Sequence, residues 1–126
     1  MDPFSSYFGT GMMEKALDAA ALRQQVISNN IANVNTAGYH RQTVAFEEKL
    51  NELCQQASED DPNSGGFPSS AQVASLEPDV ETKSGRVDIS QESTNLAKNQ
   101  ILYNALTAKI SGYLGALKYV IDNSGR

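Results

Sequence analysis

Two long stretches of this chain place apolar residues at alternating intervals of three and four, a pattern that limits the possible folds more than any other feature. The first stripe comprises Met13, Leu17, Ala20, Gln24, Ile27, Ile31 and Val34. The second comprises Leu96, Asn99, Tyr103, Leu106, Ile110, Tyr113, Leu117 and Val120. This spacing puts each stripe on one side of an α-helix and is typical of coiled coils. The sequence therefore predicts an all-α chain whose long N-terminal and C-terminal helices pair as a coiled-coil-like unit.

The first stripe predicts a helix from about Gly11 to Asn33, with Thr10 as its N-cap. Residues 29–38 then contain four Asn, one Thr and one Gly, a composition that ends helices and builds turns. Gly38 suits a backbone position with positive φ, and Asn33 or Asn35 can take the left-handed conformation or bond its own backbone. We therefore expect the chain to leave the helix at a fixed point here and turn outward.

The second stripe predicts a helix from about Ile89 to Ile121. Asp88 is its expected N-cap, with Gln91 completing a capping box, and the polar run 122–125 is a typical terminator. This helix would be about ten residues longer than the first, and each residue adds about 1.5 Å to its length. Either the stripes pack within one small domain, or the surplus apolar surface binds other chains.

A short helix is expected between the two long ones, from Val44 to about Gln56, capped by Thr43. Phe46, Leu50 and Leu53 would share one of its faces. Cys54 lies beside that face and is interpreted as a small packing residue.

The rest of the middle is expected to be irregular. Residues 58–70 are rich in Ser, Gly, Pro and acids and are interpreted as a flexible loop. Short strands are predicted over Ala71–Leu76 and Val80–Val87, with Ser84-Gly85 as a turn. The chain thus divides into an N-terminal helical segment with its Asn-rich turn (1–54), an irregular outer loop or short β-hairpin (55–87) and the C-terminal helix (88–126), which packs with the N-terminal helix as one domain.

Composition argues against several classes of function. Ten basic and fifteen acidic residues give a net charge of −5, which on average repels a nucleic-acid backbone. The single cysteine, Cys54, excludes an internal disulfide and a cysteine-rich metal site. No apolar run approaches the roughly 18 residues of a membrane span. The start Met1-Asp2-Pro3-Phe4 carries an acid where a signal peptide carries Lys or Arg, so we expect no cleaved signal peptide.

The sequence offers little from which to build a catalytic site. His40 is the only histidine and has no second ligand at metal spacing. No Gly-rich phosphate loop, Gly-x-Ser-x-Gly elbow or His-Glu-x-x-His pair is present. We therefore expect no enzyme, no cofactor and no metal; a small enzyme would require a role for His40.

Each stripe contains one amide, Gln24 in the first and Asn99 in the second. A lone polar residue at such a position can fix the register of two helices at a cost in stability. Alternatively, both amides lie at the edge of the stripe.

The segment Asn30-Ile31-Ala32-Asn33-Val34-Asn35-Thr36-Ala37-Gly38-Tyr39 resembles the N-terminal signature of the axial proteins of the bacterial flagellum, the rod and hook proteins. In that family an Asn-x-Ala-Asn-x-x-Thr-Pro-Gly-Tyr pattern ends the first long helix. Ala37 stands where proline is usual, which removes a φ restraint but keeps the Gly38-Tyr39 turn. Residues 87–89, 96–100 and 103–106 resemble the closing helix of proximal rod proteins.

The resemblance implies a subunit that leaves the cytoplasm unfolded and uncleaved through the flagellar type III export apparatus. Its terminal helices would form the inner tube of the periplasmic rod, a torque-transmitting drive shaft around the export channel. Implied partners are further copies, other rod proteins, inner-membrane ring and rod-base adaptor proteins, and the export apparatus. The alternative is a soluble helical adaptor or exported type III protein that binds a single partner.

The residues expected at subunit contacts come from both stripes and from the turn. They are Met13, Leu17, Ile27, Asn30, Ile31, Asn33, Gly38, Tyr39, Leu96, Asn99, Tyr103, Leu106, Ile110, Tyr113 and Leu117.

Overall fold

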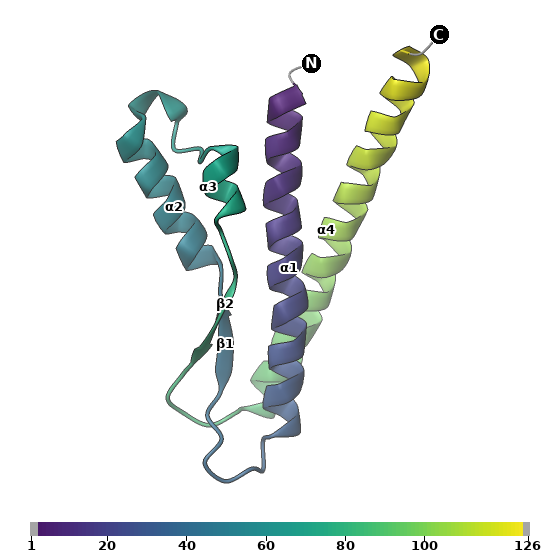
Figure 1. Cartoon of the computed structure of the whole chain (residues 1–126). Helices are drawn as coiled ribbons and strands as arrows, with labels where there is room; N and C mark the ends of the chain where they lie inside the picture. Colours follow the sequence, from purple (N-terminus) through teal and green to yellow (C-terminus); the bar gives the residue numbers. More distant parts are fainter. Residues whose placement is uncertain (1–2, 125–126) are drawn as a thin grey trace.

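The fold is organised around two long antiparallel helices, α1 (Pro3–Ala32) and α4 (Ile89–Ser124). The computed structural model describes the backbone of residues 3–124 and the side chains of residues 11–124. Both helices have their chain termini at the same end of the pair, and they separate toward that end (Figure 1). We call the end that holds Ala32 and Ile89 the closed end, and the opposite end the open end.

The predicted all-α class with two long terminal helices is confirmed. α4 begins at the predicted residue, Ile89, and α1 ends at Ala32, one residue before the prediction. The start of α1 was predicted wrongly, because the helix begins at Pro3 and Thr10 lies inside it rather than at its N-cap. Proline is well tolerated in the first turn of a helix, where its missing N–H has no partner to lose. With 30 residues in α1 and 36 in α4, the length difference is smaller than expected.

The middle of the chain is more regular than predicted. Its elements are β1 (Gln42–Ala45), α2 (Glu47–Asp60), the 3-10 turn η1 (Pro62–Ser64), α3 (Ser70–Ala74) and β2 (Asp79–Thr82). β1 and β2 form an antiparallel pair in which Val44 lies opposite Val80. The region expected to be a loop from residue 58 therefore contains the end of α2 and η1.

Two predicted elements in the middle were wrong. Thr43 and Val44 belong to β1 instead of starting a helix, because β-branched side chains suit a paired strand and Val44 is buried there. Ala71–Leu76 was expected to be a strand, but it contains α3, which is fixed by a capping box between Ser69 and Gln72. The second strand is confirmed in part, since β2 covers Asp79–Thr82, and the chain bends at Ser84-Gly85.

α1 is the central helix, because it packs on two sides (Figure 1). On one side Ala19 contacts Phe46 and Leu76. The partly buried residues around this cluster are Met12, Ala16, Leu50 and Leu53. Phe46, Leu50 and Leu53 thus share a face as predicted. On the other side, the backbone of Ala20 contacts α4 through Asn99. Ala19 and Ala20 are completely buried, and their small side chains allow neighbours to approach α1 closely on both sides.

Candidate assembly interface

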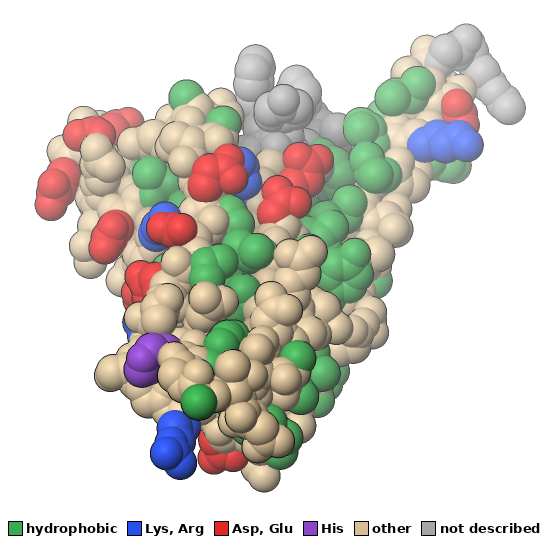
Figure 2. Space-filling model, turned by 60° about the horizontal axis from the view of Figure 1, so that its bottom comes forward, with side chains coloured by type: hydrophobic (Ala, Val, Ile, Leu, Met, Phe, Trp, Pro, Cys, Tyr) green, Lys and Arg blue, Asp and Glu red, His purple; other side chains and the backbone are tan. Residues whose placement is uncertain are grey.

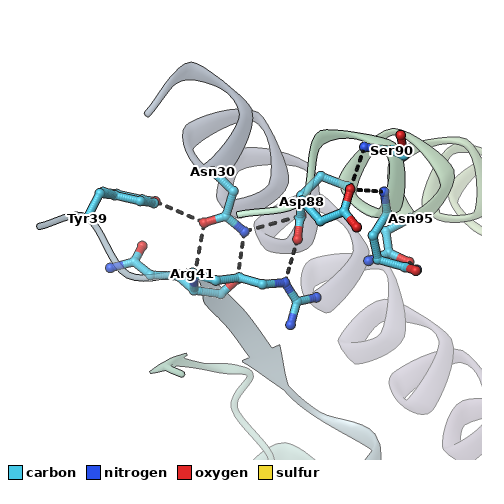
Figure 3. A network of polar contacts seen from close by, with 9 residues as sticks. Asn30, Tyr39, Arg41, Asp88, Ser90 and Asn95 are labelled. Atoms are coloured by element: carbon cyan, nitrogen blue, oxygen red, sulfur yellow. Dashed lines mark hydrogen bonds and ion pairs between the residues drawn. The ribbon is translucent and has the colours of Figure 1, made fainter. Parts of the chain in front are cut away.

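Asn30 joins α1 to the strand that follows the turn. Its Oδ1 accepts a hydrogen bond from the Gln42 N–H at 3.0 Å, and its Nδ2 donates to the Gln42 carbonyl at 2.8 Å. A side-chain amide that makes both bonds to one residue replaces the backbone of a neighbouring strand. Asn30 is completely buried, so the first residue of β1 is held at a fixed place beside α1 (Figure 3).

The same amide connects the turn to α4. Tyr39 donates its hydroxyl to Asn30 Oδ1 at 2.9 Å, and Asn30 Nδ2 donates to Glu92 Oε2 at 3.2 Å. The other carboxylate oxygen of Glu92 pairs with Arg41 Nε, and Glu92 is completely buried. We call Asn30, Tyr39, Arg41, Gln42 and Glu92 the junction network (Figure 3). A buried carboxylate is stable only with such partners, so Glu92 fixes the start of α4 against the turn.

Two further parts of the closed end agree with the sequence analysis. Asp88 caps α4, because its Oδ1 accepts from the N–H groups of Ser90 at 3.0 Å and Gln91 at 3.4 Å. The predicted capping box is wrong in its second half, because the Gln91 side chain donates to Asn95 at 3.1 Å and, among the described residues, does not bond the Asp88 N–H. Gly38 has φ 79°, the positive value that the turn was expected to require.

Asn33 also shapes the turn. Its Nδ2 donates to the Asn29 carbonyl at 2.8 Å, and its Oδ1 accepts from the Thr36 hydroxyl at 3.2 Å. These bonds satisfy backbone and side-chain groups where α1 ends. A role of Asn33 and Gly38 in subunit contact stays a prediction.

The two stripe amides meet between the helices. Asn99 Nδ2 donates to the Ala20 carbonyl at 2.8 Å and lies 3.5 Å from Gln24 Oε1. Asn99 is 3% exposed, which favours the register interpretation over a place at the edge of the stripe. Its Oδ1 is buried and has no hydrogen-bond partner in the described part of the chain.

α4 buries few apolar side chains. Its fully buried residues in the described structure are Glu92 and Asn99, both polar. Beyond Asn99 the stripe continues as Tyr103, Leu106, Ile110, Tyr113, Leu117 and Val120, which we call the α4 flank. Tyr103 is 37% and Val120 48% exposed, and the four between them are half-buried. Figure 2 shows hydrophobic side chains along α4 toward its C-terminal end. The flank thus keeps part of its apolar surface exposed in the subunit.

The predicted contact residues of the first stripe differ in burial. Ile27 is buried, whereas Met13, Leu17 and Ile31 are half-buried, as is Leu96 on α4. That these residues contact neighbouring subunits stays a prediction.

Two ion pairs connect the middle of the chain to α1, and another joins β2 to the residue that follows it. Lys15 pairs with Glu77 at 2.8 Å and Arg23 with Glu47 at 2.7 Å, and both carboxylates are exposed, so each pair adds at most about 1 kcal/mol. After β2, the hydrogen bond to Glu81, and then the charge of Glu81, raise the pKa of Lys83 above its ordinary value. These contacts align the middle with α1 more than they stabilise it.

The part of the chain that the structure describes holds neither a candidate metal site nor a candidate membrane-spanning helix. Among the described side chains, those of residues 11–124, no three His, Cys, Asp or Glu lie close enough to hold a metal ion. His40 is exposed and the Cys54 thiol is half-buried. No helix within residues 3–124 combines the length and apolar character of a membrane span.

Sequence reasoning missed Arg41 and Glu92, whose contact spans 51 positions. It also missed the second face of α1. A signal for that face exists, because a parallel stripe with the same four and three spacing precedes the first by one residue. It comprises Met12, Ala16, Ala19, Arg23, Val26 and Asn30.

Comparison with known proteins agrees with this architecture. The family model described as "Flagella basal body rod protein" matches residues 13–40, which hold most of α1 and the Asn-rich turn. The Bacillus subtilis flagellar basal body rod protein FlgB is 34% identical over 115 residues, covering 86% of this chain and 89% of that protein. FlgB of Borrelia hermsii is 32% identical, covering 76% and 82%. FlgB of Escherichia coli is 26% identical, covering 87% and 90%. No solved structure matches the chain.

A long N-terminal helix that ends in this Asn-rich turn, paired with a long C-terminal helix, defines a flagellar basal body rod protein. The similarity to the Bacillus subtilis protein extends over most of both chains and is more specific. The chain belongs to the FlgB family, and it is a structural subunit of the proximal rod.

Proposed function

We propose that the subunit polymerises through the apolar sides of α1 and α4, so that the assembled helices form a torque-transmitting shaft around an export channel. The observation that carries this proposal is the open α4 flank. Complete burial of a large apolar side chain is worth about 1.5–3 kcal/mol, and each of the six flank residues would gain part of this, because all of them keep some exposed surface in the subunit. Neighbouring subunits that cover it gain this energy without any change in the closed end.

Most of the predicted contact residues on the two helices divide into two groups by burial, while Asn33, Gly38, Tyr39 and Leu96 stay predicted contacts. Met13, Leu17, Ile31 and the α4 flank retain exposed surface, and we propose that they contact neighbours directly. Ile27, Asn30 and Asn99 are buried within the subunit. We propose that these three act indirectly, because they hold the two helices at the angle that neighbours require.

We further propose that the partners are other copies of this chain, other rod proteins, the inner-membrane ring with its rod-base adaptor proteins, and the export apparatus. The proposed place is the periplasmic rod, reached by uncleaved export. Membership of a structural family supports these assignments, and it also supports a protein without catalytic activity. Sizing the protein with candidate rod partners tests them, since an adaptor would form one defined small complex instead of an extending array.

Leu106→Asp tests the role of the flank. The substitution places a charge where neighbours would bury it without a partner, so self-association by sedimentation and motility of a complemented deletion strain should both be lost. Ser111→Asp is the matched control, because Ser111 is an exposed residue of the same helix outside the flank and acquires the same charge. Normal rods and motility with Leu106→Asp would refute polymerisation through this face.

A further inference from the structure

A groove of about 280 Å³ lies between α1, β1 and α4, and none of the α4 flank residues lines it. Arg23, Arg41 and Lys98 line it with positive charge. Val44 and Leu102 add apolar surface to its wall, and Leu102 is 41% exposed. The groove thus combines cations with an apolar surface, in a chain whose overall charge is negative.

The positive charge of the groove is only partly neutralised within the subunit. Arg23 pairs with exposed Glu47, and Arg41 pairs with buried Glu92, yet their side chains remain 22% and 32% exposed. Lys98 is exposed and has no carboxylate within 4.0 Å among the described side chains. Asn99, which also lines the groove, carries the buried acceptor without a partner. The positive charge left on the groove therefore suits an acidic segment.

The chain itself contains such a segment. Residues 47–82 hold nine of the fifteen acidic residues and one of the ten basic residues, which leaves six acidic and nine basic residues elsewhere. At the far end of α2, Glu59, Asp60 and Asp61 are all exposed. Phe67 follows a short turn later and is 70% exposed. We call residues 59–67 the acidic tip, which offers carboxylates and an aromatic ring together.

The acidic tip and the groove lie at opposite ends of one subunit. The far end of α2 lies toward the open end (Figure 1), whereas the groove is built from the first turns of α4 and the last turns of α1. They can therefore meet only between two copies. A contact between different patches of identical subunits is heterologous, and it extends into a ring or a helical array instead of closing as a dimer.

We infer that the acidic tip of one copy docks in the cationic groove of the next copy, with carboxylates of residues 59–61 at Lys98 and Arg23 and Phe67 against the apolar wall at Leu102. This inference rests on the proposed polymerisation and adds a second, polar contact to the apolar one. Such charge complementarity fixes the orientation of neighbours and speeds their encounter more than it adds affinity.

A photo-crosslinker tests this contact on the full chain. In a Cys54→Ser background, Asn95→Cys, which lines the groove but is not part of the proposed contact, is labelled with benzophenone maleimide, irradiated at low salt, and the cross-linked dimer is mapped by mass spectrometry. We expect the label on residues 59–67 of the second copy, and much less of it at 0.5 M NaCl, about the salt at which charged surfaces are largely screened. Cross-links to any other segment, or the absence of a cross-linked dimer, would overturn the inference.

Charge reversal supplies the second arm. Lys98→Glu should weaken self-association about two- to five-fold, the effect of losing an exposed ion pair. Reversing residues 59–61 to Lys in the same protein should restore it, while Lys118→Glu, an exposed lysine outside the groove, should have no effect. Equal effects of the two Glu variants would overturn the docking contact. Polymerisation through the helices is tested by a different variant, Leu106→Asp, so failure of the docking contact and failure of polymerisation can be told apart.

Discussion

The closed and open ends of the helix pair differ in how they treat polar and apolar side chains. The closed end buries polar side chains, since Asn30, Glu92 and Asn99 are at most 3% exposed. The open end exposes apolar ones, since Leu114 is 52% and Tyr119 70% exposed. Folded monomers usually show the reverse. The comparison teaches that the two ends serve different stages, the closed end defining the subunit and the open end providing surface for assembly.

The two ends can play these different roles because hydrogen bonds are directional and apolar burial is not. Hydrogen bonds depend on distance and angle, so the junction network fixes how α4 leaves the turn. Apolar burial is strong but has no preferred direction. A subunit that fixes its geometry with polar contacts can keep its apolar surface for neighbours without losing its shape.

The largest effect on the isolated subunit is expected for Glu92→Ala. Removing the buried carboxylate leaves Arg41 and the Asn30 amide without their partner, which should cost about 3 kcal/mol. Urea denaturation followed by circular dichroism measures the loss. Asp122→Ala, an exposed acid of the same helix, should change stability by less than about 0.5 kcal/mol. Similar losses for both would contradict a special role for the closed end.

Asn30→Ala should cost about 2–3 kcal/mol, because the Gln42 N–H and carbonyl lose the amide that satisfies them. Asn33→Ala is the control in the same turn and should cost about 0.5–1 kcal/mol, since its bonds are exposed. The same denaturation measurement ranks the two. If Asn33→Ala were the more harmful, the junction network would not be the main restraint on the turn.

Asn99→Leu sharpens the comparison, because here stability and geometry should move in opposite directions. The substitution removes a buried amide whose oxygen has no hydrogen-bond partner, so it should stabilise the isolated subunit by about 1 kcal/mol. The helices should then lose their unique register. Spin labels at exposed Gln25 and Gln100 would report this as a broader distance distribution. An unchanged distribution would show that apolar packing alone sets the register.

The smallest effects are expected for two glycines. Gly38→Ala should cost about 1 kcal/mol, because φ 79° is unfavourable for a residue with a Cβ. Gly112→Ala should instead stabilise the subunit by about 0.5–1 kcal/mol, since Gly112 is inside α4 and an added Cβ meets nothing within 4 Å. Thermal denaturation of both variants gives the signs. Stabilisation by Gly38→Ala would mean that the turn does not need positive φ.

Local signals account for what the sequence predicted well. The stripes, the Asp88 cap and the positive φ of Gly38 depend on neighbours within about one or two helical turns. They sufficed for the two long helices, and with the family signature they led to the correct class of protein.

The errors arose where partners are distant in the chain. Thr43 and Val44 form a strand because β2 lies opposite them, with Thr43 paired to Glu81. Glu92 is buried because Arg41 and Asn30 come from another segment. From the sequence alone, an acidic side chain in the first turn of a helix is expected to be exposed to solvent. The cationic groove is formed by residues of three elements, so no local sequence pattern predicts it.

Amide hydrogen exchange across a concentration series tests the central claim most directly. Residues 89–99, held by Glu92 and Asn99, should be protected at every concentration, because their contacts lie within the subunit. Residues 103–121 should exchange rapidly in dilute solution and become protected, with rising helicity, as subunits associate. Protection of 103–121 equal to that of 89–99 in the dilute monomer, unchanged by concentration, would contradict the division between a closed end that defines the subunit and an open end reserved for assembly.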